Sequence, residues 1–161
     1  MIKEAIKLNP NLHLKFKYIK TMLFKLSCLW ISDKRYIKRS YKYIYNREPN
    51  LVNPQTFNEK LQWLKLNHRD DLMRICADKY EVREYVKGIL GPEVLNELIG
   101  VYEHVNEINF DELPDKFVMK VTHGSGQNLI VNNKSKIDWD YESKLLSFYM
   151  YSNHYFEGRE W

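Results

Sequence analysis

The clearest structural signal in this chain is the segment Phe117-Val118-Met119-Lys120-Val121-Thr122-His123-Gly124-Ser125-Gly126-Gln127-Asn128-Leu129-Ile130-Val131. Residues 117–122 have the composition of a buried strand, and residues 128–131 have that of a second strand. A loop this short joins antiparallel neighbours, so the segment predicts a hairpin. Its two-glycine loop forms a flap at the tip.

Lys120 and the loop glycines together point to phosphate chemistry. Alternate strand residues share a face, so Lys120 lies on the face opposite Phe117 and is costly to bury without an anionic partner. Gly124 and Gly126 let backbone N–H groups approach an anion closely. A strand follows the loop, whereas Walker and dinucleotide-binding loops open a helix. A phosphate-covering flap and a plain hairpin turn therefore both stay open, and Lys120 favours the flap.

Composition sets the broad class. The chain has 161 residues, 44% hydrophobic and 29% charged, which suits one packed domain. Its 7 Phe, 12 Tyr and 4 Trp exclude a disordered tail. Cys28 and Cys76 give neither a disulfide framework nor a metal-binding spacing, and no run approaches the ~18–20 apolar residues of a membrane span. We therefore expect a cytoplasmic protein.

The charge is unevenly distributed along the chain. Residues 1–47 hold twelve Lys and Arg against two Asp and Glu, whereas residues 48–161 hold thirteen against nineteen. We expect a basic helical extension over 1–47, with helix from Ile2 to about Tyr45 and an apolar stripe, followed by a second unit over 48–161. The stripe consists of Phe16, Ile19, Leu23 and Leu26.

Two interpretations of this extension remain open. It is either an ordinary amphipathic helix with a solvated basic face, which we favour, or a peripheral contact with anionic membrane at the inner face. No groove-reading motif accompanies the basic residues, so no nucleic-acid partner is expected.

Helix signals follow from residue 53 onward. Thr56 and Glu59 form a capping box that predicts a helix near Phe57–Leu66. A second helix is expected from Asp70 or Asp71 to Lys87, with Lys79 on or beside its inner stripe. Ile99, Val101 and Val105 suggest a short strand, and Asp138 predicts the cap of a final helix.

Four ordered blocks of this sequence are similar to a known family. They are Asn53-Pro54-Gln55-Thr56-Phe57-Asn58-Glu59-Lys60 with Gln62-Trp63-Leu64-Lys65, Ala77 to Val86, Leu113 to Lys120, and His123 to Asn128. The chain resembles the TupA-like ATP-grasp family, bacterial proteins linked to teichuronopeptide and other cell-surface polysaccharide (capsule-type) synthesis. The resemblance implies an α+β fold in which residues 48–161 form the N-terminal part of an ATP-grasp domain. The small antiparallel sheet would carry the flap.

The resemblance also implies the site. Its ATP-binding positions are Lys79, Lys120, His123, Gly124, Ser125, Gly126, Gln127 and Asn128. Lys120 corresponds to the strand lysine that holds phosphates, and Lys79 to the earlier lysine that approaches the nucleotide. The full family domain uses Mg²⁺, but its ligands are not expected in this chain, and no catalytic residue is assigned.

Three functions are weighed. The first is an ATP-dependent ligase-like enzyme that activates a carboxylate as an acyl phosphate, with a polysaccharide precursor or another carboxylate as substrate. The second is a glycosyltransferase-type protein of the same pathway, for which Asp138-Trp139-Asp140 is the only metal-binding D-x-D spacing considered. The third is an inactive, truncated binding module attached to anionic membrane through residues 1–47.

Overall fold

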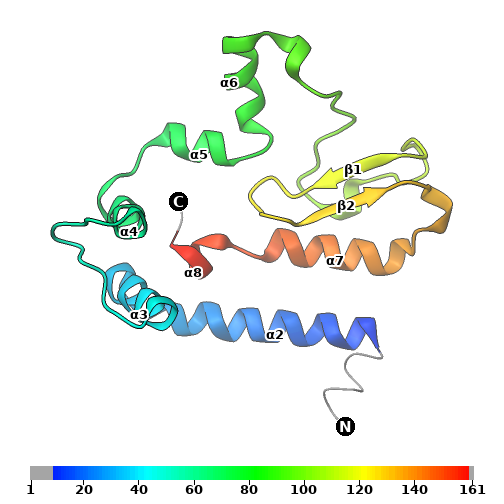
Figure 1. Ribbon diagram of the computed structural model, residues 1–161. Coiled ribbons are helices and arrows are strands. Elements are labelled where there is room, and N and C mark those ends of the chain that lie inside the picture. Colours follow the sequence, from blue (N-terminus) through cyan, green and yellow to red (C-terminus); the bar gives the residue numbers. More distant parts are fainter. Residues whose placement is uncertain (1–8, 160–161) are drawn as a thin grey trace.

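The computed structural model describes residues 9–159, and Figure 1 shows their arrangement. The elements run in the order α2 (Pro10–Leu29), α3 (Asp33–Tyr45), α4 (Phe57–Asn67), α5 (Asp71–Ala77), α6 (Glu81–Leu90), η1 (Pro92–Val94), η2 (Val105–Glu107), β1 (Phe117–Lys120), β2 (Asn128–Val131), η3 (Lys134–Lys136), α7 (Trp139–Tyr151) and α8 (His154–Gly158). The described chain is mostly helical with one two-stranded antiparallel sheet, which confirms the α+β class.

The hairpin forms as the alternating pattern predicts. β1 and β2 pair antiparallel, with Phe117 opposite Val131 and Lys120 opposite Asn128. The inner face of the sheet packs in a small core on Leu113, and its aromatic layer includes Phe117 and Trp139, whose rings stack 6.1 Å apart. Burial of this face fixes the register, because a one-residue slip would expose it.

Long helices form the lower layer of the molecule. α2 packs along α7, and the rings of Tyr18 and Phe148 meet edge to face at 4.9 Å. Asn9 caps α2 by accepting a hydrogen bond from the backbone N–H of Leu12 at 3.1 Å, as expected for an Asn-Pro helix start. None of the helices between residues 9 and 159 has the length and apolar character needed to cross a bilayer.

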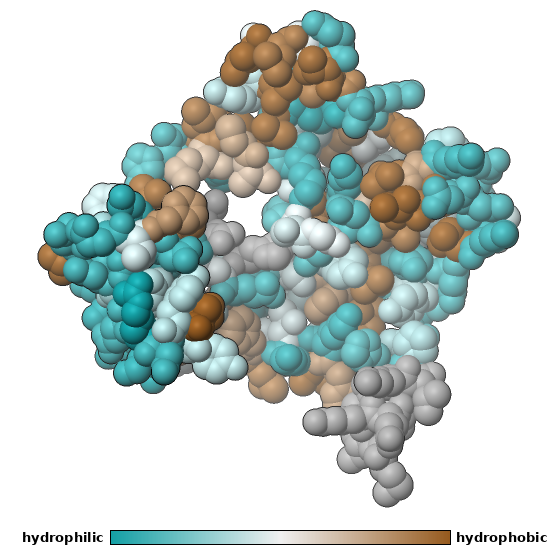
Figure 2. Space-filling view, in the orientation of Figure 1, coloured by the Kyte–Doolittle hydropathy of each residue, from teal (hydrophilic) through white to brown (hydrophobic). Residues whose placement is uncertain are grey.

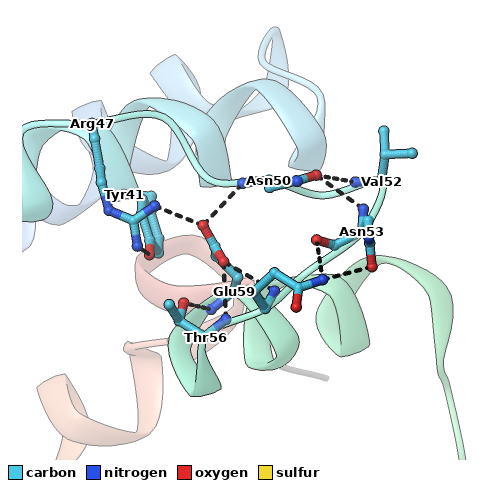
Figure 3. Close-up of polar contacts among 8 residues, drawn as sticks. Tyr41, Arg47, Asn50, Val52, Asn53, Thr56 and Glu59 are labelled. Atoms are coloured by element: carbon cyan, nitrogen blue, oxygen red, sulfur yellow. Dashed lines mark hydrogen bonds and ion pairs between the residues drawn. The ribbon is translucent and has the colours of Figure 1, made fainter.

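A hydrogen-bonded network around the carboxylate of Glu59 joins the end of α3 to α4 (Figure 3). We call this network the Glu59 clasp. Glu59 is 3% exposed, and it accepts hydrogen bonds from the Arg47 guanidinium at 2.7 Å and from the backbone N–H of Asn50 at 3.2 Å. Its other oxygen accepts from the backbone N–H of Thr56, while the Thr56 hydroxyl accepts from that of Glu59, which confirms the predicted capping box. The clasp ties the basic extension to the following unit, and the domain boundary at residue 47 stays a prediction.

Two expected elements are wrong. The helix expected from Asp70 or Asp71 to Lys87 is broken into α5 and α6 around Lys79, and α6 continues past Gly88 to Leu90. The strand expected over Ile99 to Val105 is absent among the described residues: this segment has no regular secondary structure and ends in η2. A strand needs a hydrogen-bonded neighbour, and among the described residues β1 and β2 pair only with each other.

The basic extension also differs from expectation. The helix is interrupted at residues 30–32, between α2 and α3, and the part of the expected helix before residue 9 lies outside the described residues. The predicted apolar stripe does not face the body of the protein. Phe16 and Leu23 are 46% and 57% exposed, whereas Leu14 and Cys28 are buried. Contacts with α7 and α8 select this inner face, which periodicity alone did not identify.

Candidate functional site

The break between α5 and α6 places Lys79 at the end of β1. Asp78 accepts hydrogen bonds from the backbone N–H groups of Tyr80 at 2.8 Å and Glu81 at 2.9 Å, which starts α6 afresh. The backbone N–H of Lys79 donates to the carbonyl oxygen of Thr122 at 3.0 Å. The sequence block at 77–86 therefore meets the chain between the last two blocks, at the end of the hairpin strand.

The Lys79 side chain holds the beginning of the glycine loop. Its ammonium donates to the carbonyl oxygens of Val121 at 3.0 Å and Thr122 at 3.3 Å, and also to that of Gly124. Three carbonyl acceptors satisfy a part-buried ammonium without a carboxylate. In this structure Lys79 braces the loop, and its predicted contact with ATP stays a prediction.

Lys120 lies where the hairpin opens into the loop. It is exposed, with Asn128 directly opposite on the neighbouring strand, so the two side chains share one face. Val118 lies on this face too and is 49% exposed, whereas Phe117 and Val121 on the other face are buried. The predicted alternation is confirmed, and it leaves the Lys120 ammonium at the surface of the hairpin.

The loop has a conformation that depends on glycine. Gly126 has a φ of +72°, a left-handed value that L side chains rarely adopt. The Gln127 side chain folds over Gly124, so closely that a Cβ there would lie 2.1 Å from Gln127 Oε1. That oxygen is buried without a hydrogen-bond donor among the described residues. A buried acceptor without a donor costs free energy, so a ligand or a loop movement that supplies one stabilises the loop.

His123 connects the loop to the end of α7. Its Nε2 lies 2.9 Å from the carbonyl oxygen of Ser152, a buried residue that caps α7. Together with Lys79, this contact fixes the loop from two sides, which leaves residues 125–127 at its tip.

A cavity of about 760 Å³ adjoins these residues. Lys79, Lys120 and His123 line it, and Arg83 adds a further cation. Apolar groups supply much of the remaining wall: Leu98, Ile99, Val101, Val118, Leu146 and Met150. A mainly apolar cavity with cations beside a glycine loop suits a ligand that has a flat apolar part and an anionic part.

Hydrogen bonding sets the charge of the acidic group beside the cavity. Burial alone would raise the pKa of the Asp78 carboxyl, but hydrogen bonds from the backbone N–H of Glu81 and from the Thr122 side chain lower it below its usual range. Asp78 is therefore ionised at neutral pH. Its negative charge lies behind the loop, where it supports α6 and Thr122.

Arg83 also joins two elements beside the cavity. Its guanidinium donates to the carbonyl oxygen of Asn96 at 2.7 Å, which fastens α6 to the segment lining the cavity. Within residues 9–159, no three His, Cys, Asp or Glu side chains form a group that would hold a metal ion. These residues do not fit Mg²⁺, and we assign no step to it.

A family model provides the identification. The model of the TupA-like ATPgrasp family matches residues 59–161. This chain is a member of the TupA-like ATP-grasp family. Comparisons with curated proteins and with solved structures gave no significant match. The matched region of this TupA-like ATP-grasp chain begins inside α4, continues through α8, and includes every residue predicted to bind ATP.

The structure brings most of the predicted site together but adds residues to it. Lys79, Lys120 and His123 line the cavity, whereas the loop residues Gly124 to Asn128 lie beside it. Sequence reasoning missed Asp78 as the group that starts α6. The spacing Asp78-x-x-Glu81 is that of a helix N-terminus and would have indicated the break. No local signal showed that residues 98–102 line the cavity.

Proposed function

We propose that this chain is an ATP-binding protein of the ATP-grasp type that acts in bacterial cell-surface polysaccharide biosynthesis. The observation that carries the proposal is the position of Lys120, which lines the cavity and lies beside the glycine loop. Membership of the TupA-like ATP-grasp family supports ATP as the nucleotide.

The cavity has suitable groups for both parts of ATP. The apolar wall formed by residues such as Ile99 and Leu146 suits a purine base, and Lys120 with Asn128 suits phosphate oxygens. Backbone N–H groups at the loop tip would add donors, as in other anion-binding turns. Lys79 would serve ATP directly only if it left the carbonyl oxygens that it now holds. Otherwise it supports binding by keeping the loop in place.

The proposed reaction is ATP-dependent ligation of a carboxylate. A carboxylate oxygen attacks the γ-phosphorus and ADP leaves, which gives an acyl phosphate. An amine or similar nucleophile then attacks the acyl carbon, the bond to the phosphate oxygen breaks, inorganic phosphate leaves, and the nucleophile releases a proton. In such transfers, positioning and neutralisation of phosphate charge account for much of the catalysis. Lys120 is the residue that we expect to supply that charge.

The sugar-transfer alternative has less support from the side chains. Asp138 caps α7 by accepting from the backbone N–H of Tyr141 at 3.1 Å, and Asp140 pairs with Lys144 at 2.6 Å. Both carboxylates of the D-x-D spacing therefore have structural partners. No observation favours an inactive module over a nucleotide-binding one.

A competition experiment tests the proposal. Fluorescent ATP analogue bound to the full chain is displaced with ATP, ADP or a nucleoside-diphosphate sugar. We expect ATP and ADP to displace the analogue at much lower concentration than the sugar nucleotide. Stronger displacement by the sugar nucleotide would replace the proposal with glycosyl transfer, and failure of the analogue to bind at all would support the inactive module.

A further inference from the structure

The outer face of α2 is apolar, although it is turned away from the rest of the described chain. Six side chains follow one another at steps of four and three residues along it: Leu12, Phe16, Ile19, Leu23, Leu26 and Trp30. Each is at least 38% exposed, and Trp30 is 89% exposed. Figure 2 shows brown residues along the lower rim, where α2 runs. We refer to these six residues as the outer stripe.

Lysines occupy both faces of α2, but in different environments. On the inner face, Lys25 lies over the ring of Tyr151, with its ammonium 3.6 Å from the centroid, and donates to the Tyr151 carbonyl oxygen. Lys15 and Lys20 are exposed and border the outer stripe on its two sides. α2 has no Asp or Glu, so the acidic and basic side chains that α2 itself places beside the stripe are all basic.

This charge pattern discriminates between possible partners. A second copy of the chain, paired through the outer stripe, would set lysines against lysines and has no acid in α2 to offset the repulsion. An anionic lipid surface accepts the apolar side chains and attracts the lysines at the same time. Phe16 and Trp30 are residue types that favour the interfacial region of a bilayer.

α3 adds positive charge on the same side of the molecule. Its buried residues, Ile37 and Tyr41, lie on the side that packs toward α4, while Arg35, Arg39 and Lys42 are exposed. Figure 1 shows α4, α7 and α8 above the layer formed by α2 and α3, so the outer faces of both helices look to the lower side. The apolar stripe of α2 and the exposed basic residues of α3 thus lie on the side away from α4, α7 and α8.

We propose that the outer stripe of α2, flanked by Lys15 and Lys20 and supplemented by the basic face of α3, binds an anionic membrane surface. α2 lies in the plane of the interface, with its apolar face in the lipid and its inner face on α7. Such a contact is independent of nucleotide and leaves the cavity near Lys120 free to act.

Vesicle co-sedimentation of the full chain tests this proposal. Vesicles of phosphatidylcholine alone are compared with vesicles that also contain phosphatidylglycerol, at low and high salt. We expect binding to the anionic vesicles only, with loss at high salt. Lys15→Gln with Lys20→Gln should weaken binding by roughly thirtyfold, because each lysine near an anionic surface contributes a factor of about five to six in affinity.

Two further variants leave the net charge unchanged, so they test the contribution of the apolar side chains to vesicle binding. Leu23→Ser with Leu26→Ser keeps the net charge and should abolish binding, while Val52→Ser, at a 93% exposed loop position, should bind as the unmodified chain does. Circular dichroism confirms that each variant is folded. Absence of binding to anionic vesicles, or unchanged binding in the leucine variant, overturns the proposal. A concentration-dependent dimer that disappears in the leucine variant would identify a second copy as the partner instead.

Discussion

The backbone N–H of Lys79 donates to the carbonyl oxygen of Thr122 at 3.0 Å, across 43 positions of sequence. The hydrogen bond joins the break between α5 and α6 to the end of β1, and the Lys79 ammonium continues the connection to the loop. The lysine that the family resemblance assigns to the nucleotide is thus also a structural support of the glycine loop.

Replacing Lys79 tests this support directly. Lys79→Met removes the ammonium that holds three carbonyl oxygens, so the amides of residues 121–127 should exchange hydrogen faster even without nucleotide. Lys79→Arg keeps the charge and should restore part of the protection. If exchange in the loop is unchanged in Lys79→Met while ATP binding is lost, Lys79 acts on the phosphates and not as a brace.

Two glycines provide a matched pair for the backbone of the loop. Gly126→Ala places a Cβ at φ +72° and should destabilise the protein by about 1 kcal/mol. Gly88→Ala lies inside α6 with open space around it and should stabilise by roughly 0.5–1 kcal/mol. Urea denaturation of both variants measures the change in the free energy of unfolding, which should have opposite signs at the two sites. Equal effects at the two sites would refute the conformational explanation.

The Glu59 clasp predicts an acid-sensitive stability. Hydrogen bonds from Thr56, Arg47 and Asn50 lower the pKa of Glu59 to about 2, from 4.5 for a free side chain. A carboxyl with a lowered pKa in the folded state stabilises the fold above its unfolded pKa, and this stabilisation is lost as pH falls from about 4.5 toward 2. The melting temperature of the unmodified chain should fall across that window.

Glu59→Gln tests the origin of that fall. At neutral pH we expect a melting temperature lower by about 5 °C or more, since a buried charge-assisted network is broken. The difference from the unmodified chain should shrink toward pH 2. Glu84→Gln, whose side chain is 82% exposed, is the control and should change little. If the difference in melting temperature between Glu59→Gln and the unmodified chain persists at pH 2, altered packing explains it and not the loss of the charge.

The elements that could be predicted are those with a local cause. The capping box at Thr56, the cap at Asp138 and the alternation around Lys120 each act within a few residues, and each is confirmed. The break at Lys79 could not be placed in the same way, because its partner Thr122 is distant in sequence. The same holds for the inner face of α2, which contacts such as Tyr18 with Phe148 select.

The residues of the candidate site also fall into two groups, those with a local signal in the sequence and those placed by tertiary packing. The glycine loop and Lys120 follow from the sequence, since strand alternation and glycine chemistry act locally. The contact of His123 with Ser152 and the cavity wall formed by residues 98–102 depend on tertiary packing. Sequence alone therefore predicts the residues that we propose for phosphate binding, but it does not predict the apolar wall of the cavity.

The central claim is that ATP binds at the cavity beside Lys120, and a thermal-shift titration of the full chain with Mg-ATP tests it most directly. A ligand that binds only the folded state at one hundred times its Kd stabilises by about 2.7 kcal/mol, which raises the melting temperature by several degrees. We predict this rise for the unmodified chain and for Lys116→Ala, an exposed lysine just before β1, and its loss in a folded Lys120→Ala. No rise in the unmodified chain, or an equal rise in Lys120→Ala, would contradict the account.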